Sequence, residues 1–270
     1  VSGWVGVQLS SFYGALSSTG SFYYHADLSA SGLSPPFGPE RGGTRVVVLG
    51  SGFRDAYTLR CGFGSSVTPV LARFIDESQL ECVTPFHVAG NVSLLLSMNG
   101  QQYGASGATD TYQSSAFVSY VLPSAVLSEG GTPVTVHGSG FSSSSEASGM
   151  LTCRIGATVR RAVWMSSSAV VCNSTRGAAG SVRVEVSNNA KEYTTSGVRL
   201  RLVAVRVLDM TPWSGPLGGG TVVSMRGSGA WPGAMRCTFG DGAASSGWGG
   251  GASRLRCLTP VSSSGVSGWV

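Results

Sequence analysis

The segment GGTRVVVLGSGF at residues 42–53 decides how the rest of the chain is interpreted. A glycine pair precedes a short valine-rich run, and a Gly-Ser-Gly turn followed by an aromatic residue closes it. Because successive side chains of a strand point to opposite faces, Val46 and Val48 share one face of a predicted strand. Glycine tolerates positive φ and close backbone approach, so the glycine pair predicts a tight turn before this strand.

The same segment occurs twice more in the chain. It returns as GGTPVTVHGSGF at residues 130–141 and as GGTVVSMRGSGA at residues 219–230. The second glycine of the pair advances by 88 residues, from Gly43 to Gly131, and then by 89 residues to Gly220. A nearly constant period indicates an array of like modules.

A proline and two cysteines repeat with the same period. These positions are Pro35, Pro123 and Pro212, then Cys61, Cys153 and Cys237, then Cys82, Cys172 and Cys257. The first cysteine opens a Cys-x-x-Gly motif, and in two repeats the second opens Cys-x-Thr-Pro. Together with the glycine-pair strand, these motifs resemble the IPT/TIG domain. This family of immunoglobulin-like β-sandwiches occurs in plexins, the hepatocyte growth factor receptor and fibrocystin-like surface proteins, and also in Rel-type transcription factors.

The resemblance implies an all-β chain of tandem immunoglobulin-like (IPT/TIG) sandwiches. A period near 88 residues suits sandwiches of this kind. We expect complete modules at residues 34–121 and 122–210. We expect residues 1–33 to be the last strands of a preceding module and residues 211–270 to be the first part of a further one.

The cysteines indicate an oxidising compartment. One pair falls in each module at a matched position, so we predict the disulfides Cys61–Cys82, Cys153–Cys172 and Cys237–Cys257. A zinc site would instead require Cys-x-x-Cys spacing or a nearby histidine, and none of the three histidines has such spacing. We therefore expect no metal and no cofactor.

Two glycosylation sequons agree with a chain outside the cell. They are Asn91-Val92-Ser93 and Asn173-Ser174-Thr175, and we expect glycans on Asn91 and Asn173. The sequence contains no apolar run long enough to cross a bilayer, so we expect no direct membrane insertion. The predicted location is extracellular or at the cell surface.

The sequence offers little chemistry for catalysis or nucleic-acid binding. The net charge of +5 comes almost wholly from arginines, and these are scattered rather than clustered as a nucleic-acid footprint requires. Asp76 and Glu77 are adjacent on a predicted strand and point apart, which opposes general acid–base work. We expect a protein that is not an enzyme and does not bind nucleic acid.

The two ends of the chain share a five-residue sequence. Val-Ser-Gly-Trp-Val stands at residues 1–5 and again at residues 266–270. We predict that the late strands at the start complete the early strands at the end, head to tail, through Trp4, Val5, Val7 and Trp269. The completing segment is either part of one long array or a strand donated by another copy.

These observations favour a structural extracellular glycoprotein whose modules form a rod or filament, with itself and glycans as partners. The alternative is the ectodomain of an adhesion or signalling receptor that resembles plexins or fibrocystin. A nuclear DNA-binding module of the Rel type is a third possibility, which the paired cysteines and scattered arginines oppose.

Overall fold

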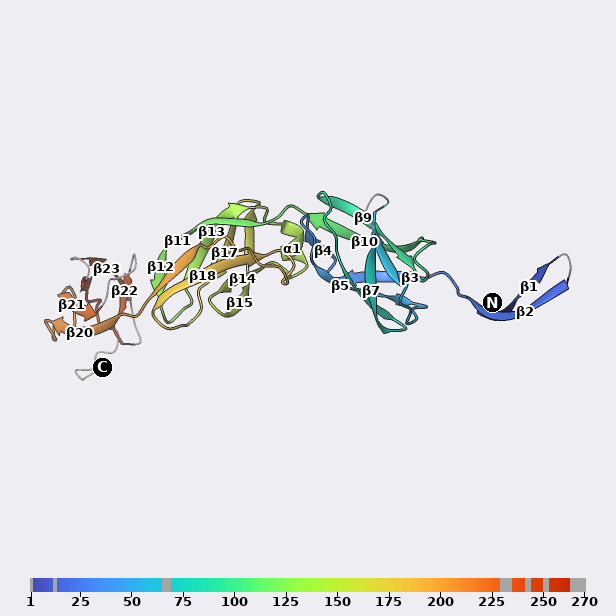
Figure 1. Cartoon of the computed structure of the whole chain (residues 1–270). Coiled ribbons are helices and arrows are strands. Elements are labelled where there is room, and N and C mark those ends of the chain that lie inside the picture. The colour runs from blue at the N-terminus through green and yellow to red at the C-terminus, as the bar shows by residue number, and fades with distance from the viewer. Residues whose placement is uncertain are drawn as a thin grey trace. The chain divides into compact units, whose positions relative to one another are not determined.

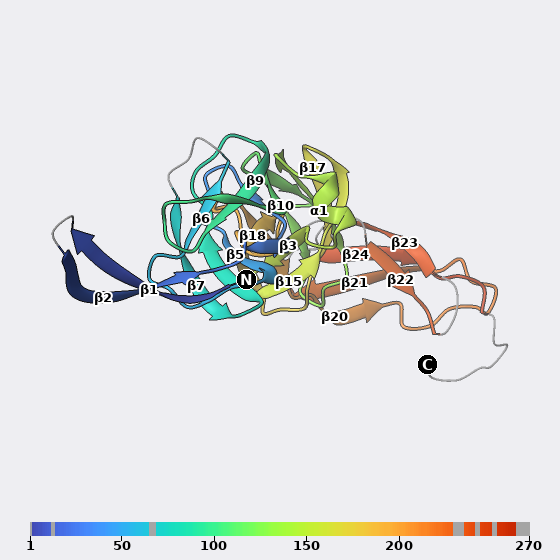
Figure 2. The same ribbon diagram turned by 90° about the vertical axis from the view of Figure 1, so that its right-hand side faces the viewer.

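The structure is a computed structural model of the chain (Figure 1; Figure 2) and describes residues 2–11, 14–64, 69–228, 235–240, 244–249 and 253–262. The regular structure of these residues is almost entirely β-strand, which confirms the predicted all-β class. One short helix, α1 (Ser143–Ala147), occurs among them. The chain divides into two compact units, residues 1–115 and 116–270.

The first unit begins with a β-hairpin. Strands β1 (Gly3–Ser11) and β2 (Gly14–Tyr24) pair antiparallel and form a two-stranded sheet of their own. The register pairs Gly3 with Tyr24 and Val5 with Phe22. An isolated two-stranded hairpin buries little apolar surface and is marginally stable at best.

The first module (residues 29–113) is a sandwich built from the remaining strands of this unit. Its strands are β3 (Ser29–Ser34), β4 (Phe37–Pro39), β5 (Arg45–Ser51), β6 (Arg60–Phe63), β7 (Val70–Asp76), β8 (Gln79–Val83), β9 (Gly90–Ser97) and β10 (Gly104–Gln113). They follow the order β3-β5-β8-β7-β6-β9-β10-β4, with β7 pairing first with β6 and then with β8. The core contains Val46 and Val48 of the glycine-pair strand, as the alternation predicted.

The second module (residues 117–203) repeats this plan. Its strands are β11 (Phe117–Leu122), β12 (Ala125–Leu127), β13 (Pro133–Ser139), β14 (Thr152–Ile155), β15 (Thr158–Arg161), β16 (Val163–Ser166), β17 (Ala169–Asn173), β18 (Gly180–Ser187) and β19 (Arg199–Val203). They form two sheets, in the orders β11-β13-β17-β16 and β12-β19-β18-β14-β15.

The third repeat (residues 206–262) contains five strands. They are β20 (Arg206–Thr211), β21 (Val222–Ser228), β22 (Met235–Thr238), β23 (Ala244–Gly249) and β24 (Arg254–Leu258). Their order is β20-β21-β24-β23-β22. Its buried apolar cluster holds three residues, Cys237, Leu255 and Cys257, whereas each of the two modules has a far larger one.

The structure places the first strand of each repeat five residues before the predicted boundary. Strand β3 pairs with β5, β11 pairs with β13, and β20 pairs with β21. These strands begin at residues 29, 117 and 206, whereas the predicted boundaries were at residues 34, 122 and 211. Each first strand belongs with the glycine-pair strand that follows it, because backbone hydrogen bonds join the two.

The glycine pair is explained by a close backbone contact. Gly42 has a φ of +70°, and a Cβ atom there would lie 2.4 Å from the carbonyl oxygen of Pro85. Gly130 and Gly219 have the same positive φ, and a Cβ on either would come within 2.6 Å of a backbone atom. Only glycine combines this φ with this proximity, so the turn before each strand is specified by its sequence.

Candidate functional site

A disulfide lies inside each repeat and joins strands of different sheets in the two modules. The bridges are Cys61–Cys82, Cys153–Cys172 and Cys237–Cys257, the pairs that the spacing predicts. They connect β6 with β8, β14 with β17, and β22 with β24. All six cysteines are buried.

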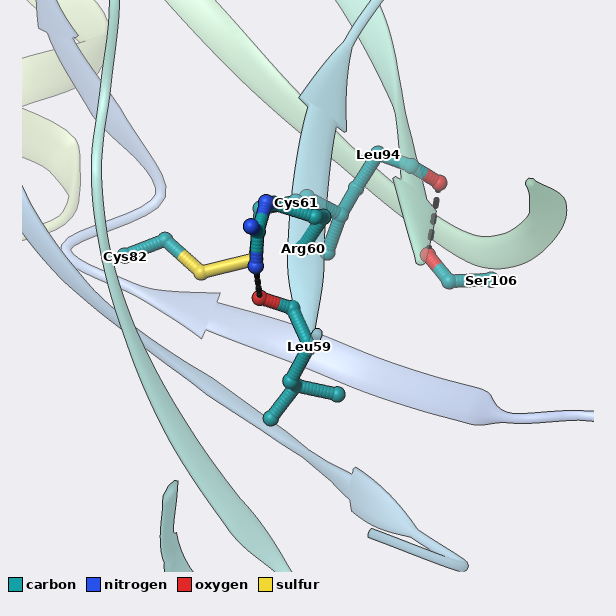
Figure 3. Close-up of a disulfide and its surroundings, with 6 residues drawn as sticks. All are labelled: Leu59, Arg60, Cys61, Cys82, Leu94 and Ser106. Carbon is teal, nitrogen blue, oxygen red and sulfur yellow. Dashed lines mark hydrogen bonds between the residues drawn. A yellow bond between two sulfur atoms is a disulfide. The ribbon is translucent and has the colours of Figure 1, made fainter. Parts of the chain in front are cut away.

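Figure 3 shows the surroundings of the first bridge. Leu59 and Leu94 flank it and are completely buried. The Arg60 guanidinium donates a hydrogen bond to the carbonyl oxygen of Leu59 over 3.0 Å. The Ser106 hydroxyl donates to the carbonyl oxygen of Leu94 over 2.8 Å. Since a thiolate cannot reach a buried disulfide, this bridge serves as a structural cross-link and not as an exchanging one.

A buried acidic residue distinguishes the core of the first module. Asp110 on β10 is completely buried, and neither carboxylate oxygen has a hydrogen-bond partner among the described residues. Burial raises the pKa of this carboxyl to about 6, although the Thr111 backbone amide partly opposes the rise. Tyr112, two residues along the same strand, is also buried, and its pKa is raised by burial and by the charge of Asp110. The His87 ring lies against Tyr112, with 5.0 Å between the ring centroids.

The second module has apolar residues at the same three places. The strand registers pair Val92 with Asp110 and Val182 with Leu200 in equivalent positions. Leu200 therefore corresponds to Asp110, Leu202 to Tyr112 and Gly177 to His87. Leu200 and Leu202 are buried in the core. A Cβ on Gly177 would lie 3.0 Å from the Leu202 side chain, so leucine fills the space that the Tyr112–His87 stack occupies in the first module.

A second shared feature is a turn that follows β9 and β18. The Asn99 side-chain oxygen accepts hydrogen bonds from the backbone N–H groups of Gln101 and Gln102, over 3.0 and 3.1 Å. The Asn189 side-chain oxygen accepts equivalent bonds from residues 191 and 192, both over 3.1 Å. The residue after each asparagine has positive φ, +73° at Gly100 and +57° at Ala190. The segments SMNGQQY and SNNAKEY carry this signal as an asparagine followed by a residue that must adopt the left-handed region.

The comparison with known families confirms the predicted resemblance. The family model for the IPT/TIG domain matches residues 28–113 and residues 116–201, which together make up more than half of the chain. The chain belongs to the IPT/TIG family. The matched segments begin beside β3 and β11, in agreement with the strand pairing that places these strands in the IPT/TIG modules.

Two curated relatives contain sequence similar to this IPT/TIG chain. Fibrocystin-L of Mus musculus is 26% identical over 210 residues, which cover 76% of this chain and 5% of that protein. Fibrocystin-L of Homo sapiens is 26% identical over 167 residues, which cover 60% of this chain and 4% of that protein. The chain thus spans about a twentieth of the length of these relatives.

Solved structures that are similar to the chain include the full extracellular region of plexin A4. The likeness covers 89% of this chain and 21% of that one, with 15% identity and a TM-score of 0.47. The bacterial adhesin FdeC of Escherichia coli gives 15% identity and a TM-score of 0.27, with 88% of this chain and 91% of that one covered.

The predicted glycosylation sites lie on the surface of the two IPT/TIG modules. Asn91 is exposed near the start of β9, and its side-chain oxygen accepts a hydrogen bond from the Thr111 hydroxyl over 2.9 Å. Asn173 is exposed at the end of β17, directly after Cys172. Both side chains are exposed in the folded modules, and glycans on them stay a prediction.

The histidines among the described residues lie apart from one another and contact different partners. His137 stacks on Tyr120 with 4.5 Å between ring centroids, and the His25 ring bonds to the carbonyl oxygen of Ala26. Across the residues that the structure describes, no three His, Cys, Asp or Glu side chains are grouped to hold a metal ion. No helix in these ranges is long and apolar enough to cross a membrane. A chain without enzyme activity, metal or cofactor stays a prediction.

The residues predicted to take part in head-to-tail completion lie on the N-terminal hairpin, apart from Trp269, which lies outside the described residues. Trp4 is 72% exposed and contacts Tyr23, with 5.1 Å between ring centroids. Val5 and Val7 lie on the opposite face of β1, because alternate residues face opposite sides. A partner that packs on one face of β1 would therefore cover either Trp4 or the two valines, and not all three. The prediction of head-to-tail completion is not tested by the hairpin alone.

Proposed function

We propose that this chain is part of the extracellular portion of a cell-surface protein, where its IPT/TIG modules bind partners through their surfaces and carry out no catalysis. The observation that carries the proposal is the buried disulfide in every repeat, because such bonds form and persist in oxidising compartments. The two exposed sequons and the similarity to fibrocystin-L support the same location. Binding of partners through the module surface is consistent with a fold whose described polar and titratable side chains are spread out.

Expression in two compartments tests this proposal. A chain directed into the secretory pathway of mammalian cells should be released with three intramodule disulfides and with glycan on Asn91 and Asn173. Non-reducing peptide mapping and intact-glycopeptide mass spectrometry measure both features. The matched control is the chain made in a reducing cytosol. Equal folding there with six free thiols would contradict the proposal.

Removal of a single disulfide tests the same proposal through its effect on stability and secretion. The double variant Cys153→Ala, Cys172→Ala opens a 19-residue loop and should lower the free energy of unfolding of the second module by about 3 kcal/mol. Secretion of this variant should fall, since the cell retains poorly folded chains. Secretion at the level of the unchanged chain, with unaltered hydrogen exchange in the second module, would argue against a structural role for the bridge.

A structural rod or filament is a second candidate, which the repetition of like modules with short connections favours. Electron microscopy of the native particle separates the two functions. A continuous fibre of regular width supports the filament, whereas single chains attached to a membrane support the receptor ectodomain. The sequence that flanks this chain in its gene also separates the two functions, because a membrane span followed by a cytoplasmic domain supports the receptor ectodomain.

A further inference from the structure

One sheet of the second module has an outer face without charged side chains. The sheet has the order β11-β13-β17-β16, and none of these four strands contains an Asp, Glu, Lys or Arg residue. Side chains alternate along β17, so the buried Val170 and Cys172 face the core and Val171 faces outward. The strand registers align the outward side chains in two rows across the sheet, which are Leu122, Thr135, Val171 and Val163, then Tyr120, His137 and Ala169. These two rows are called the outer face below.

The outer face is broad and exposed to solvent. Tyr120, Leu122 and Val163 have exposed fractions of 49%, 54% and 55%. Neighbouring strands are about 4.8 Å apart, so the row from Leu122 to Val163 spans roughly 14 Å. A contiguous exposed apolar surface of this kind marks a place where another group binds.

The same face is charged in the other two repeats. The three sheets are aligned by a pair that each forms between a core valine and its second cysteine, namely Val46–Cys82, Val134–Cys172 and Val223–Cys257. In the first module, Glu81 stands in the place of Val171. Arg73 stands in the place of Val163, and its Nε atom lies 3.7 Å from a carboxylate oxygen of Glu81. In the third repeat, Arg256 stands in the place of Val171. The fold therefore accepts charge here, and the apolar face is particular to the second module.

The second module also carries a glycosylation sequon at the end of this face. Asn173 ends β17 and points outward, because it stands two residues after Val171 on the same strand. Thr175 supplies the hydroxyl of the sequon where the other repeats have proline. The other repeats have apolar residues in the place of the asparagine, Val83 and Leu258. The repeat that lacks charge on this face is thus the repeat that can attach a glycan there.

We propose that the N-glycan on Asn173 lies back over the outer face and covers it. Two residues of a strand span about 7 Å, so Val171 and Thr135 are the first outward side chains along the path from Asn173. Tyr120 and His137 come next, and their stacked rings offer a flat aromatic surface with 4.5 Å between the centroids.

The chemistry of a glycan suits this surface. A sugar ring presents C–H groups on its two faces and hydroxyls around its rim. The C–H groups pack on aliphatic and aromatic side chains and remove them from water, while the hydroxyls stay hydrated. The proposal rests on the proposed extracellular location, because N-glycans are attached in the secretory pathway.

The other sequon provides a matched control, because Asn91 has polar surroundings. The Thr111 hydroxyl donates a hydrogen bond to its side-chain oxygen over 2.9 Å. Ser93 and Thr109 form the next outward pair on these two strands. A glycan on Asn91 therefore starts over hydroxyl groups and has no apolar face to cover.

Loss of each sequon in turn tests the proposal. Thr175→Ala and Ser93→Ala keep both asparagines but remove one glycan each from the chain secreted by mammalian cells. Hydroxyl-radical footprinting with mass spectrometry measures the solvent access of single side chains. Oxidation of Tyr120 and Leu122 should rise several-fold in Thr175→Ala and stay unchanged in Ser93→Ala. Equal oxidation in the unchanged chain and in Thr175→Ala overturns the proposal. If Thr175→Ala is poorly secreted, trimming the folded Ser93→Ala glycoprotein to a single sugar with an endoglycosidase gives the same comparison.

A charged outer face provides the second test. Val163→Arg combined with Val171→Glu places the ion pair of the first module on the second. The glycan should then leave the face, so oxidation of Tyr120 should be the same with and without Thr175→Ala. Protection by the glycan that persists on the charged face contradicts the proposed packing.

Glycopeptide mass spectrometry of the same samples separates this inference from the proposed location. Glycan on Asn91 but not on Asn173 overturns the inference and leaves the extracellular location standing. Absence of glycan from both sites counts against both proposals.

Discussion

The first and second modules share one fold but differ in what fills the same corner of the core. The first buries Asp110 and Tyr112 there, with the half-buried His87 ring against Tyr112, and the second buries Leu200 and Leu202 against Gly177. An unpaired carboxyl in an apolar core costs free energy, and the cost grows when the group ionises. The disulfide and the glycine-pair turn are the same in both modules, so the two differ chiefly in this polar part of the core. It teaches that the sandwich tolerates this acid, at a cost that depends on pH.

The largest effect is expected when the acid is moved into the second module. Leu200→Asp removes buried methyl groups and places an unpaired carboxylate in an apolar core. We expect the second module to lose at least about 5 kcal/mol at pH 7, because roughly 2–5 kcal/mol from lost packing adds to the cost of the unpaired carboxylate. Hydrogen exchange measured by mass spectrometry resolves the modules and should show faster exchange in the strands of the second module and unchanged exchange in the first.

The matched control for this change is Leu200→Asn, which has nearly the same shape and no charge. It should lose less stability than Leu200→Asp at pH 7 and the same amount at pH 4. If the two variants behave alike at both values, the charge does not contribute, and the comparison between the modules concerns shape only.

The second effect comes from removing the acid from the first module. The pKa of Asp110 is raised by burial from 3.8 to about 6, so the folded module binds more protons than the unfolded chain between these values. Its contribution is therefore fully present below pH 4 and is lost as pH rises through 6. Asp110→Asn should raise the free energy of unfolding of the first module by about 3 kcal/mol at pH 7 and change it little at pH 4.

Hydrogen exchange of β9 and β10 between pH 4 and pH 8, corrected for intrinsic rates, measures this dependence. The second module in the same molecule is the internal control, because Leu200 does not titrate. A first module whose stability rises with pH across this window in the unchanged chain, and does so equally in Asp110→Asn, would refute the assigned role of Asp110.

The smallest effect concerns the turn that follows β9 and β18, where Asn99 and Asn189 accept backbone hydrogen bonds. Ala190 adopts a φ of +57°, whereas its counterpart Gly100 adopts +73° with no Cβ to strain. Ala190→Gly should stabilise the second module by about 0.5–1 kcal/mol, and Gly100→Ala should destabilise the first by a similar amount. Thermal unfolding of the two variants beside the unchanged chain measures both. Shifts of the same sign would show that the two turns are not equivalent.

The glycine pairs and the cysteines could be predicted from the sequence because they have the same structural role in every repeat. The glycine pair must pass close to backbone, and the two cysteines must meet across the sheets. The first strand of each module was placed too late because its only marker is pairing with a distant strand. Asp110 was missed because the segment GATDTYQ alternates small and polar residues and resembles a solvated strand. Burial of that face becomes visible only when β3 and β9 are packed beside it.

The cross-sheet disulfide has a mechanical consequence. When a module is pulled by its two ends, the covalent path runs through the bridge, so the residues between the cysteines bear no tension. In the first module this shielded loop closes 21 residues, from Cys61 to Cys82. At about 3.5 Å per extended residue, the bridge shortens the stretched length of that module by roughly 70 Å. Reduction should release this hidden length in a single-molecule pulling trace, one step for each bridge.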